Sequence, residues 1–419
     1  MRFAYVILSY LLAPVAFGFL LWRGFGNRAY WQRFGERLGY GECRLDEPSI
    51  WIHAVSVGEV QAAAALVKTL RQRYPDTPMV LTTVTPTGLE TAQAKFGDSV
   101  CYSYAPYDLP RAVRRFFDRV QPKLAIVLET ELWPNLYHEC GRRNVPLVLA
   151  SARISPRSVH KYRRLLGLFR EALSHGIVIA AQSEKDAERF RSLGANAART
   201  HVTGNIKFDF ELPASVVEDG RRLRALHAPG RPVWIAASTH EAEEGQVLDA
   251  FVRLRADVND ALLMLVPRHP DRFGDVAALL RARGFRFVTR SSGGTCDPAT
   301  PVFLGDSLGE LPVFYAAADV AFVGGSLVPV GGHNLLEPAA LALPVLTGPY
   351  TFNAEEIAAL LIEQGAARVV RNHTELAAAL LRYFRDPALR ERDGNAGLET
   401  VRANRGALER LIELVDPLI

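Results

Sequence analysis

Residues 50–84 read IWIHAVSVGEVQAAAALVKTLRQRYPDTPMVLTTV, and this stretch decides the fold class. Its two short apolar runs, 50–55 and 79–84, predict strands, and the amphipathic stretch 59–74 between them predicts a helix. A strand, a helix and a second strand in this order form a βαβ unit. The sequence therefore predicts an α/β protein whose parallel sheet is covered by helices on both faces.

The same alternation continues along the chain, with one interruption at residues 205–230. Residues 49–204 and 231–419 therefore predict two Rossmann-like domains, and 205–230 predicts the linker between them. Because such sheets bind ligands at the carboxyl ends of their strands, we expect the two domains to face a common cleft. The predicted strands are 50–55, 79–84, 124–128, 146–150, 176–180, 233–237, 261–266, 285–289, 301–304, 319–323 and 344–346. The predicted helices are 59–74, 110–120, 134–144, 155–173, 184–193, 243–254, 272–283, 311–317, 335–341 and 353–364.

The N-terminus differs from the rest of the chain in its lack of charge. Residues 3–22 carry no charged side chain, and a helix of this length can cross a hydrocarbon layer of about 30 Å. A cleaved signal peptide and a buried core helix are the alternatives. The single leading charge and the missing A-x-A site count against the first, and the length of the run counts against the second. We predict that residues 1–22 anchor the chain in a membrane.

A basic juxtamembrane segment, residues 23–48, follows the predicted anchor. Its positive charge predicts that the rest of the chain lies on the cytoplasmic side of the membrane. We expect its arginines to contact anionic lipid headgroups. They are Arg23, Arg28, Arg33, Arg37 and Arg44.

The composition is that of an ordinary globular protein with a weak positive charge. A length of 419 residues exceeds what one hydrophobic core usually supports, which agrees with two domains. A net charge of +4 is too weak to indicate nucleic acid, although it suits an anionic membrane or phosphorylated substrates. The 4 cysteines have no CxxC spacing, so we predict free thiols and neither a zinc site nor a disulfide framework.

Acidic residues follow two predicted strands of the first domain. Glu59 opens a helix, where it is either a charge that favours the helix N-terminus or a general base that faces the cleft. Glu129 and Glu131 follow a second strand, together with Trp133. Metal binding is one interpretation of these acids, but no His or Asp cluster accompanies them. Binding of substrate hydroxyls, or support of the base, is the favoured interpretation.

Four loops of the second domain carry glycines and charged side chains directly after predicted strands, so we expect them to meet at one sheet edge. Gly331 and Gly332 precede a predicted helix and would offer backbone N–H groups to an anion. Glu337, one helical turn after His333, can reach a ribose diol, and Arg268 can bind phosphate through two hydrogen bonds. The pattern predicts a nucleotide-phosphate site. Its residues are Arg268, His269, Gly309, Glu310, Leu311, Gly332, Asn334 and Glu337.

These motifs occur in the order found in a known family. WIHAVSVGE (51–59), ETELWPN (129–135), PRHP (267–270) and GGHNLLEPA (331–339) resemble the bacterial 3-deoxy-D-manno-octulosonic acid (Kdo) transferases of lipopolysaccharide assembly. The resemblance extends from the N-terminus to about residue 370. It implies a GT-B fold and a metal-independent, cofactor-free, inverting reaction at the cytoplasmic face of the inner membrane. That reaction would transfer Kdo from CMP-Kdo to a lipid A precursor, tetraacyl lipid IVA.

The resemblance also implies roles for individual residues. Glu59 would be the general base, and Glu131 would be a second essential carboxylate near the acceptor. The implied CMP-binding residues are Arg268, the Gly309–Leu311 turn, Asn334 and Glu337. Three alternatives stay open: a GT-B transferase that uses a UDP-sugar on another lipid acceptor, a nucleotide-sugar epimerase, and a membrane-tethered nucleotide-binding or scaffold protein.

Overall fold

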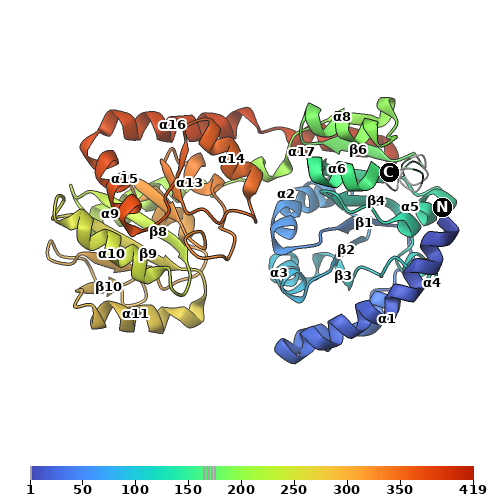
Figure 1. Cartoon of the computed structure of the whole chain (residues 1–419), viewed down its shortest axis with the longest axis horizontal. Coiled ribbons are helices and arrows are strands. Elements are labelled where there is room, and N and C mark those ends of the chain that lie inside the picture. The colour runs from blue at the N-terminus through green and yellow to red at the C-terminus, as the bar shows by residue number, and fades with distance from the viewer. Residues whose placement is uncertain (1, 164–166, 168–169, 171–172, 174–175) are drawn as a thin grey trace. The chain divides into compact units, whose positions relative to one another are not determined.

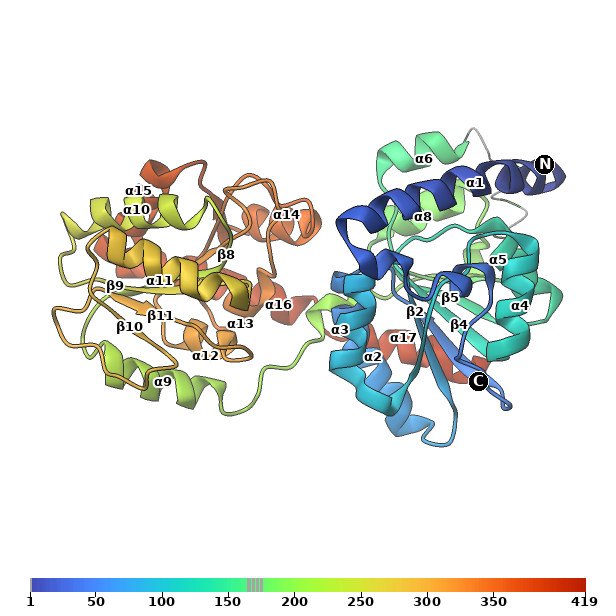
Figure 2. The same cartoon turned by 90° about the horizontal axis from the view of Figure 1, so that it is seen from below.

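The computed structural model describes residues 2–163, 167, 170, 173 and 176–419. The contacts divide the chain into two compact units: unit 1 contains Met1–Phe210 and Asn404–Ile419, and unit 2 contains Glu211–Ala403. Within the described residues, each unit is built on one parallel sheet with helices on both of its faces (Figure 1 and Figure 2). The predicted α/β class with two parallel-sheet domains is confirmed.

The sheet of unit 1 has a reversal in its strand order. Its strands are β1 Ser49–His53, β2 Met79–Thr83, β3 Cys101–Tyr104, β4 Pro122–Leu128, β5 Leu147–Ala152, β6 Val178–Ala181 and β7 Thr200–Val202. Their order is β3-β2-β1-β4-β5-β6-β7, and the pairs are parallel. The order reverses between β1 and β4, which is where open α/β sheets bind their ligands.

Several helices of unit 1 begin at residues that favour a helix N-terminus. The helices that the structure describes in unit 1 are α1 Arg2–Gly26, α2 Val57–Arg73, α3 Pro86–Phe96, α4 Pro110–Val120, α5 Pro134–Arg142, α6 Pro156–Arg163, α8 Glu184–Ser192 and α17 Ala407–Val415. The hydroxyl of Thr85 accepts the N–H of Gly88 and caps α3, and the hydroxyl of Ser183 accepts the N–H of Asp186 and caps α8. Proline stands in the first turn of α3, α4 and α5, where its missing N–H is not needed.

Unit 2 repeats this architecture. Its strands are β8 Val233–Thr239, β9 Leu262–Pro267, β10 Phe287–Thr289, β11 Val302–Leu304, β12 Val320–Val323, β13 Val345–Thr347 and β14 Ala367–Val369, in the order β10-β11-β9-β8-β12-β13-β14. Its helices are α9 Val216–His227, α10 Glu244–Arg255, α11 Phe273–Ala282, α12 Leu311–Ala316, α13 Leu336–Ala340, α14 Glu355–Glu363, α15 His373–Arg385 and α16 Pro387–Ala403. The order reverses between β8 and β12, so the loops after these two strands form the expected ligand-binding edge.

Apolar side chains fill both faces of each sheet, which explains why the strands read as continuous apolar runs. Successive side chains of a strand point to opposite faces. In β1, Trp51 packs in one apolar cluster with Phe116, whereas Ile50 and Ile52 pack in a second cluster. All five residues of β1 are buried, as expected for a parallel strand covered by helices on both sides.

The C-terminal end of the chain returns to unit 1, so the predicted second domain 231–419 is wrong for its last residues. The carboxylate of Asp209 accepts the N–H groups of Gly406 (2.6 Å) and Leu408 (2.7 Å) and so holds the start of α17. The buried residues of α17 complete the apolar cluster that contains Ile50. The predicted linker 205–230 is also divided, because its first residues belong to unit 1 and α9 belongs to unit 2.

The structure contains several elements that the sequence did not predict. They are β3, β7, β14, α3, α15, α16 and α17. The predicted helix 155–173 is represented by α6, and most of its second half lies outside the described residues.

The prediction of four free cysteines is wrong for one pair. Cys43, in the segment before β1, and Cys101, at the start of β3, form a disulfide with Cα atoms 5.8 Å apart. The fold brings the two residues together although 58 positions separate them in the sequence. Cys140 and Cys296 are free, as predicted, and both are buried.

The basic segment 23–48 folds as part of unit 1. The Arg37 guanidinium is buried, lies over the Tyr104 ring at 4.2 Å and donates to the main-chain oxygen of Val84. Arg33 pairs with Glu36 at 2.8 Å. The expectation that Arg37 contacts lipid is therefore wrong, because burial within unit 1 removes its side chain from the surface.

Candidate active site

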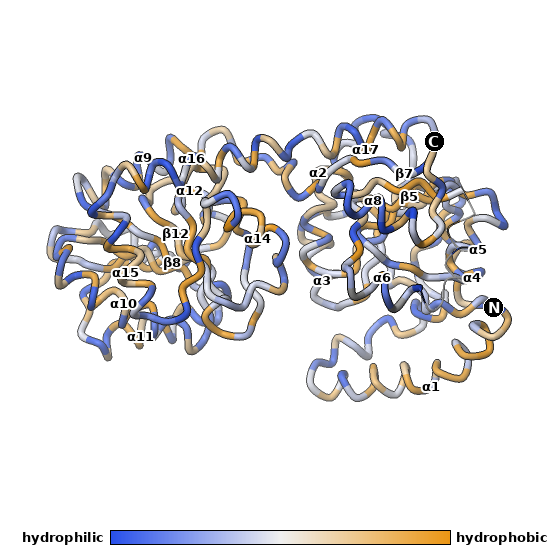
Figure 3. Tube along the Cα trace, turned by 45° about the horizontal axis from the view of Figure 1, so that its top comes forward, coloured by the Kyte–Doolittle hydropathy of each residue, from blue (hydrophilic) through white to orange (hydrophobic). Residues whose placement is uncertain are grey.

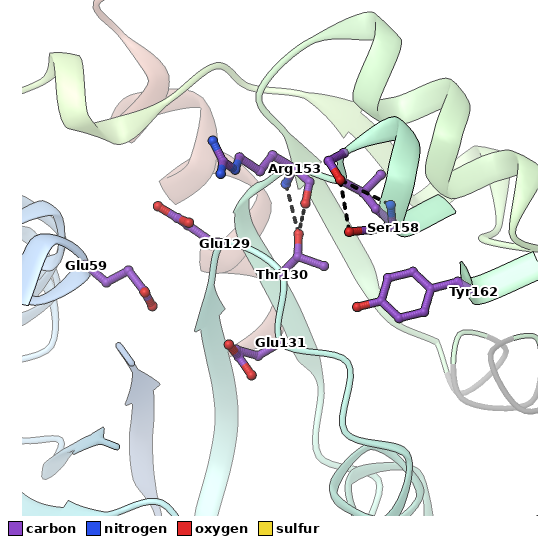
Figure 4. Close-up of a pocket in the computed structure, with 9 residues that line it drawn as sticks. Glu59, Glu129, Thr130, Glu131, Arg153, Ser158 and Tyr162 are labelled. Carbon is purple, nitrogen blue, oxygen red and sulfur yellow. Dashed lines mark hydrogen bonds between the residues drawn. The ribbon is translucent and has the colours of Figure 1, made fainter. Parts of the chain in front are cut away.

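The carboxyl ends of β1 and β4 place three acidic side chains around one pocket. The pocket has a volume of about 220 Å³. Figure 4 shows the carboxylates of Glu59, Glu129 and Glu131 pointing into this space. The remaining lining residues are Thr130, Arg153, Ile154, Ser155, Ser158 and Tyr162. β1 and β4 are far apart in the sequence but neighbours in the sheet. The residues that directly follow these two strands therefore lie close together at this edge.

Glu59 lies in the first turn of α2, and its side chain folds back over the turn that leads into the helix. Its Oε2 accepts the N–H of Val55 at 2.8 Å, and its Oε1 accepts the hydroxyl of Ser56 at 3.0 Å. The residue is only 9% exposed. Burial, together with the charge of Glu129, raises the pKa of Glu59 to about 7, although the two hydrogen bonds act to lower it. A carboxyl group with this pKa can accept a proton at neutral pH.

Glu129 is held by a cation and by an unusual backbone conformation. The Nζ of Lys207 lies 2.6 Å from its Oε1. Its φ of +56° is in the left-handed region that L-residues rarely adopt. Such strained positions persist where the surrounding structure enforces them, and they cluster at functional sites. The ion pair with Lys207 fixes the position of the Glu129 carboxylate at the pocket.

Two aromatic residues hold Glu131: Trp133, in the same loop, and Tyr137, in α5. The indole Nε1 of Trp133 donates to its Oε2, and the hydroxyl of Tyr137 donates to its main-chain oxygen. Burial raises the pKa of Glu131, the Trp133 hydrogen bond opposes this, and the charge of Glu129 adds to the increase. The Trp133 ring packs edge-on against His53 with centroids 5.8 Å apart. Glu131 therefore has little freedom to move.

The opposite wall of the pocket is polar and comes from the loop after β5 and from α6. The hydroxyl of Thr130 donates to the main-chain oxygen of Arg153 and accepts its N–H. The Oγ of Ser155 accepts the N–H of Ser158 at 3.1 Å. A pocket lined by carboxylates, hydroxyls and one guanidinium suits a ligand that is rich in hydroxyl groups.

In unit 2, three histidines from three loops meet at the reversal of strand order. The Nε2 atoms of His240, after β8, and His333, after β12, lie 2.8 Å apart. The ring of His269, after β9, lies 5.2 Å from that of His240. Burial, together with His240 and Arg268, lowers the pKa of His333 to about 3. Burial also lowers the pKa of His240, so the short contact joins two neutral imidazoles, one ring N–H donating to the other ring.

A buried carboxylate holds the glycine-rich loop after β12. Glu243 is 0% exposed. Its two oxygens accept the N–H groups of Gly325 (2.7 Å), Ser326 (3.1 Å), Leu327 (2.8 Å) and His240 (3.3 Å). One side chain thus joins the loop that carries His333 to the loop that carries His240. Sequence analysis did not single out Glu243, although it stands in the motif STHEAEE (238–244).

The prediction that Gly331 and Gly332 offer their backbone N–H groups to an anion is wrong. The N–H groups of both glycines donate to the main-chain oxygen of Gly325, at 3.0 and 2.8 Å. They are therefore satisfied within the loop and do not point at an open site. The loop folds in this way because Glu243 holds the N–H groups of residues 325–327 from the other side.

The other predicted residues of unit 2 form two further groups. Asn334 donates to Glu337 Oε1 at 3.0 Å, and its Oδ1 accepts the N–H of Leu336 at the start of α13. Glu310 pairs with Arg290 at 2.6 Å, and the side chain of Arg290 holds the pKa of Glu310 below its usual value. Gly309 has a φ of +82°, which makes the turn that leads into Leu311 and α12. Within the described residues, no group of three or more His, Cys, Asp or Glu is arranged to hold a metal ion.

Comparison with known proteins identifies the family. Residues 32–210 match the family model described as 3-Deoxy-D-manno-octulosonic-acid transferase (kdotransferase). The 3-deoxy-D-manno-octulosonic acid transferase of Haemophilus influenzae is 45% identical over 421 residues, which cover 100% of this chain and 99% of that protein. The chain belongs to the Kdo transferase family. The corresponding transferase of Bordetella pertussis is 38% identical over 426 residues, 97% of this chain and 98% of that protein.

The structural likeness extends to other sugar-nucleotide enzymes. The UDP-GlcNAc 2-epimerase of Neisseria meningitidis, solved with UDP-GlcNAc, superposes with a TM-score of 0.57 at 13% identity and covers 88% of this chain and 99% of that one. At this identity the likeness shows the fold alone, and the predicted GT-B fold is confirmed. Membership of the Kdo transferase family makes the chain a glycosyltransferase. It favours Kdo transfer over the alternatives of UDP-sugar transfer and epimerisation.

Several residues that line this pocket, or that pair with its carboxylates, were missing from the predicted set. Arg153 and Lys207 stand in the motifs SAR (151–153) and GNIKFD (204–209), which resemble the family. A basic residue inside such a motif was the signal that could have identified both. Tyr162, in α6, stands in no such motif, and only the fold brings it to the pocket.

Proposed function

We propose that this chain transfers Kdo from CMP-Kdo to a hydroxyl group of a lipid A precursor, with inversion at the anomeric carbon. Unit 1 would hold the acceptor, and unit 2 would hold the donor nucleotide. The observation that carries the proposal is Glu59, a buried carboxyl group whose pKa lies near 7, in a polar pocket that two further carboxylates also line.

Glu59 is the general base of the proposed reaction. Its carboxylate already accepts hydrogen bonds from Val55 and Ser56, and an ionised carboxylate has further lone pairs for the hydroxyl of an acceptor. As the acceptor oxygen forms its bond to the anomeric carbon, its proton passes to Glu59. The bond between that carbon and the phosphate oxygen breaks, and its electron pair leaves with CMP. Attack from the face opposite the leaving group inverts the configuration through an oxocarbenium-like transition state, as in inverting glycoside chemistry.

The other charged residues act on binding and on the leaving group. Glu131, which Trp133 holds in place, would bind acceptor hydroxyls beside the base. Arg268 would neutralise the phosphate as CMP leaves, because a guanidinium can bind phosphate oxygens with two hydrogen bonds. The Gly309–Leu311 turn, His269, Asn334 and Glu337 would complete the nucleotide site.

The proposed acceptor is a lipid, so the reaction takes place at a membrane surface. We place it at the cytoplasmic face of the inner membrane, where anionic lipids would attract the exposed arginines of residues 23–44. Arg23, Arg28 and Arg44 are exposed and available for this contact.

The direct test is the reaction itself. The purified full-length protein is incubated in detergent with an acylated diglucosamine phosphate and with CMP-Kdo generated in situ. Mass spectrometry should find the acceptor extended by Kdo, and NMR of the product should find the anomeric configuration opposite to that of the donor. Extension with a UDP-sugar and none with CMP-Kdo would contradict the proposal, and retention of configuration would contradict its mechanism.

A further inference from the structure

Helix α1 has one face against unit 1 and an apolar face that is exposed. The length and hydropathy of α1 are sufficient for a membrane span. Partly or fully buried residues recur along it every three or four positions, which is the spacing of a single helix face. They include Tyr5, Ser9, Ala13, Phe17, Leu20 and Gly24. Helix α1 is hydrophobic along most of its length (Figure 3), and large apolar side chains are exposed on its opposite face. Its most exposed residues, 53–80% accessible, include Phe3, Leu11, Val15, Phe19, Trp22 and Phe25.

The N-terminal part of α1 is bound to a polar site of unit 1. The hydroxyl of Tyr5 donates to Asp108 Oδ2 at 2.7 Å. The same carboxylate accepts the N–H groups of Asn135 (3.0 Å) and Leu136 (2.8 Å) at the start of α5. Figure 1 and Figure 2 both show the N-terminus beside α5. Tyr5 is thus connected to the loop before α4 and to the first turn of α5.

The C-terminal part of α1 is packed equally closely. The Phe17 ring lies 5.0 Å from that of Phe34 and 5.1 Å from that of Tyr107. The indole of Trp31 donates to the main-chain oxygen of Leu21 at 3.0 Å. A Cβ atom at Gly24 would lie 1.7 Å from Trp31 Nε1, so only glycine permits this approach.

These contacts are incompatible with a helix that crosses a bilayer. From Tyr5 to Leu21 the helix rises roughly 24 Å, most of the roughly 30 Å thickness of the hydrocarbon layer. A spanning α1 that kept its contacts would carry Asp108 and the loop around it into hydrocarbon. Irregular backbone exposed to lipid does not occur there, because its polar groups would lack partners. A spanning α1 that left unit 1 would instead expose Phe34 and Tyr107, the aromatic partners of Phe17, to water.

We propose that α1 lies in the plane of the membrane surface and does not cross it. The exposed apolar face enters the boundary between headgroups and acyl chains of one leaflet, and the opposite face stays on unit 1. The occupant of the apolar face is an anionic bilayer, because Arg23, in the last turn of α1, and Arg28, directly after the helix, are both exposed. An interfacial helix usually carries charged residues on the face that points away from the lipid. In α1 that face packs on unit 1 instead, so length and hydropathy alone predict a span. This proposal is independent of the reaction that the chain catalyses.

The first test is the side of the membrane on which the N-terminus lies. The full-length chain carries one epitope tag before Met1 and a different tag after Ile419, and it is expressed in Gram-negative cells. Proteinase K is added to intact and to lysed spheroplasts. We expect both tags to survive in intact spheroplasts and to be digested after lysis. Digestion of the N-terminal tag alone in intact spheroplasts would show a crossing helix and overturn the proposal.

The second test measures depth along the helix. Phe3→Cys, Leu11→Cys and Phe19→Cys each receive a bimane label on the exposed face, and Ala13→Cys is the control on the face toward unit 1. Wild type treated with the same bimane reagent checks that the native cysteines, which are disulfide-bonded or buried, do not react. The proteins are bound to vesicles of phosphatidylethanolamine and phosphatidylglycerol with nitroxides at shallow or deep acyl positions.

Adjacent labels on the exposed face are separated by roughly 12 Å along the helix axis, so the two orientations give different depth patterns. We expect Phe3→Cys, Leu11→Cys and Phe19→Cys to be quenched most strongly by the shallow nitroxide and to equal degrees, with Ala13→Cys quenched several-fold less. A deep position for Leu11→Cys between two shallow ends would overturn the proposal.

Discussion

Replacing Glu59 by glutamine should stabilise the folded protein at pH 8 relative to wild type, and should do so much less at pH 4.5. Burial raises the pKa of Glu59 from 4.5 to about 7 in the folded state. Between these values the folded chain binds a proton that the unfolded chain has released, so the stability of wild type falls as pH rises through this window. The contribution is present in full below pH 4.5 and is lost above about pH 7. Glutamine does not titrate and lacks this slope.

The size of the effect follows from the same pKa values. The increase spans about 2.5 pH units at about 1.36 kcal/mol each, so the difference in unfolding free energy between variant and wild type should change by roughly 3 kcal/mol. Glutamine preserves the local contacts, because its oxygen can accept the N–H of Val55 and its amide can donate to Ser56. The charge is therefore the main property that the substitution removes.

Urea unfolding of the full-length proteins in detergent, followed by intrinsic fluorescence at pH 4.5 and pH 8, measures this difference. Glu184→Gln is the matched control: Glu184 also lies in the first turn of a helix, but its side chain is 61% exposed. We expect no comparable dependence on pH for the control. An equal difference between wild type and Glu59→Gln at both pH values would refute the assignment of a raised pKa.

Three further outcomes follow from the contacts of the site. The kcat/KM of transfer should rise with pH to a plateau above about 7, and Glu129→Gln should shift that rise to lower pH, because the Glu129 charge raises the pKa of Glu59. A pH–rate profile tests both. If kcat/KM of Glu129→Gln rose at the same pH as wild type, or at a higher pH, this would contradict the effect of Glu129 on the pKa of Glu59. Arg268→Ala should lower kcat/KM on the order of 10²-fold, with a smaller loss for Arg268→Lys; equal activity in steady-state assays would place the phosphate elsewhere. Glu243→Gln should destabilise unit 2 by about 1–3 kcal/mol, because a glutamine side chain cannot accept four N–H groups. It should also weaken CMP binding in calorimetry while leaving the pH–rate profile unchanged. A CMP affinity equal to that of wild type would contradict the role of Glu243 in holding the loop after β12.

Local sequence patterns predicted the central strands and most of the helices that cover them. The strand predicted at 79–84 corresponds to β2 Met79–Thr83, and the helix predicted at 110–120 is α4 Pro110–Val120. Continuous apolar runs are reliable signals because parallel strands are buried on both faces. The strands β7 and β14 were missed because each has three residues, of which only the first is buried.

Long-range pairings account for the parts of the site that the sequence did not predict. Lys207 meets Glu129 across 78 positions, and His240 meets His333 across 93. No periodicity or spacing carries such information, because only the pairing of the strands in the sheet brings these loops together. The same reason explains α17, whose amphipathic pattern predicts an apolar face without indicating which unit that face covers.

The central claim is that Glu59 removes the acceptor proton in Kdo transfer. Single-turnover transfer from CMP-Kdo should be compared for wild type, Glu59→Gln and Glu184→Gln, with CMP affinity measured by calorimetry on the same preparations. The account predicts a loss on the order of 10²-fold or more for Glu59→Gln, with CMP affinity unchanged and Glu184→Gln as active as wild type. A Glu59→Gln protein that turns over at a rate near that of wild type would contradict it.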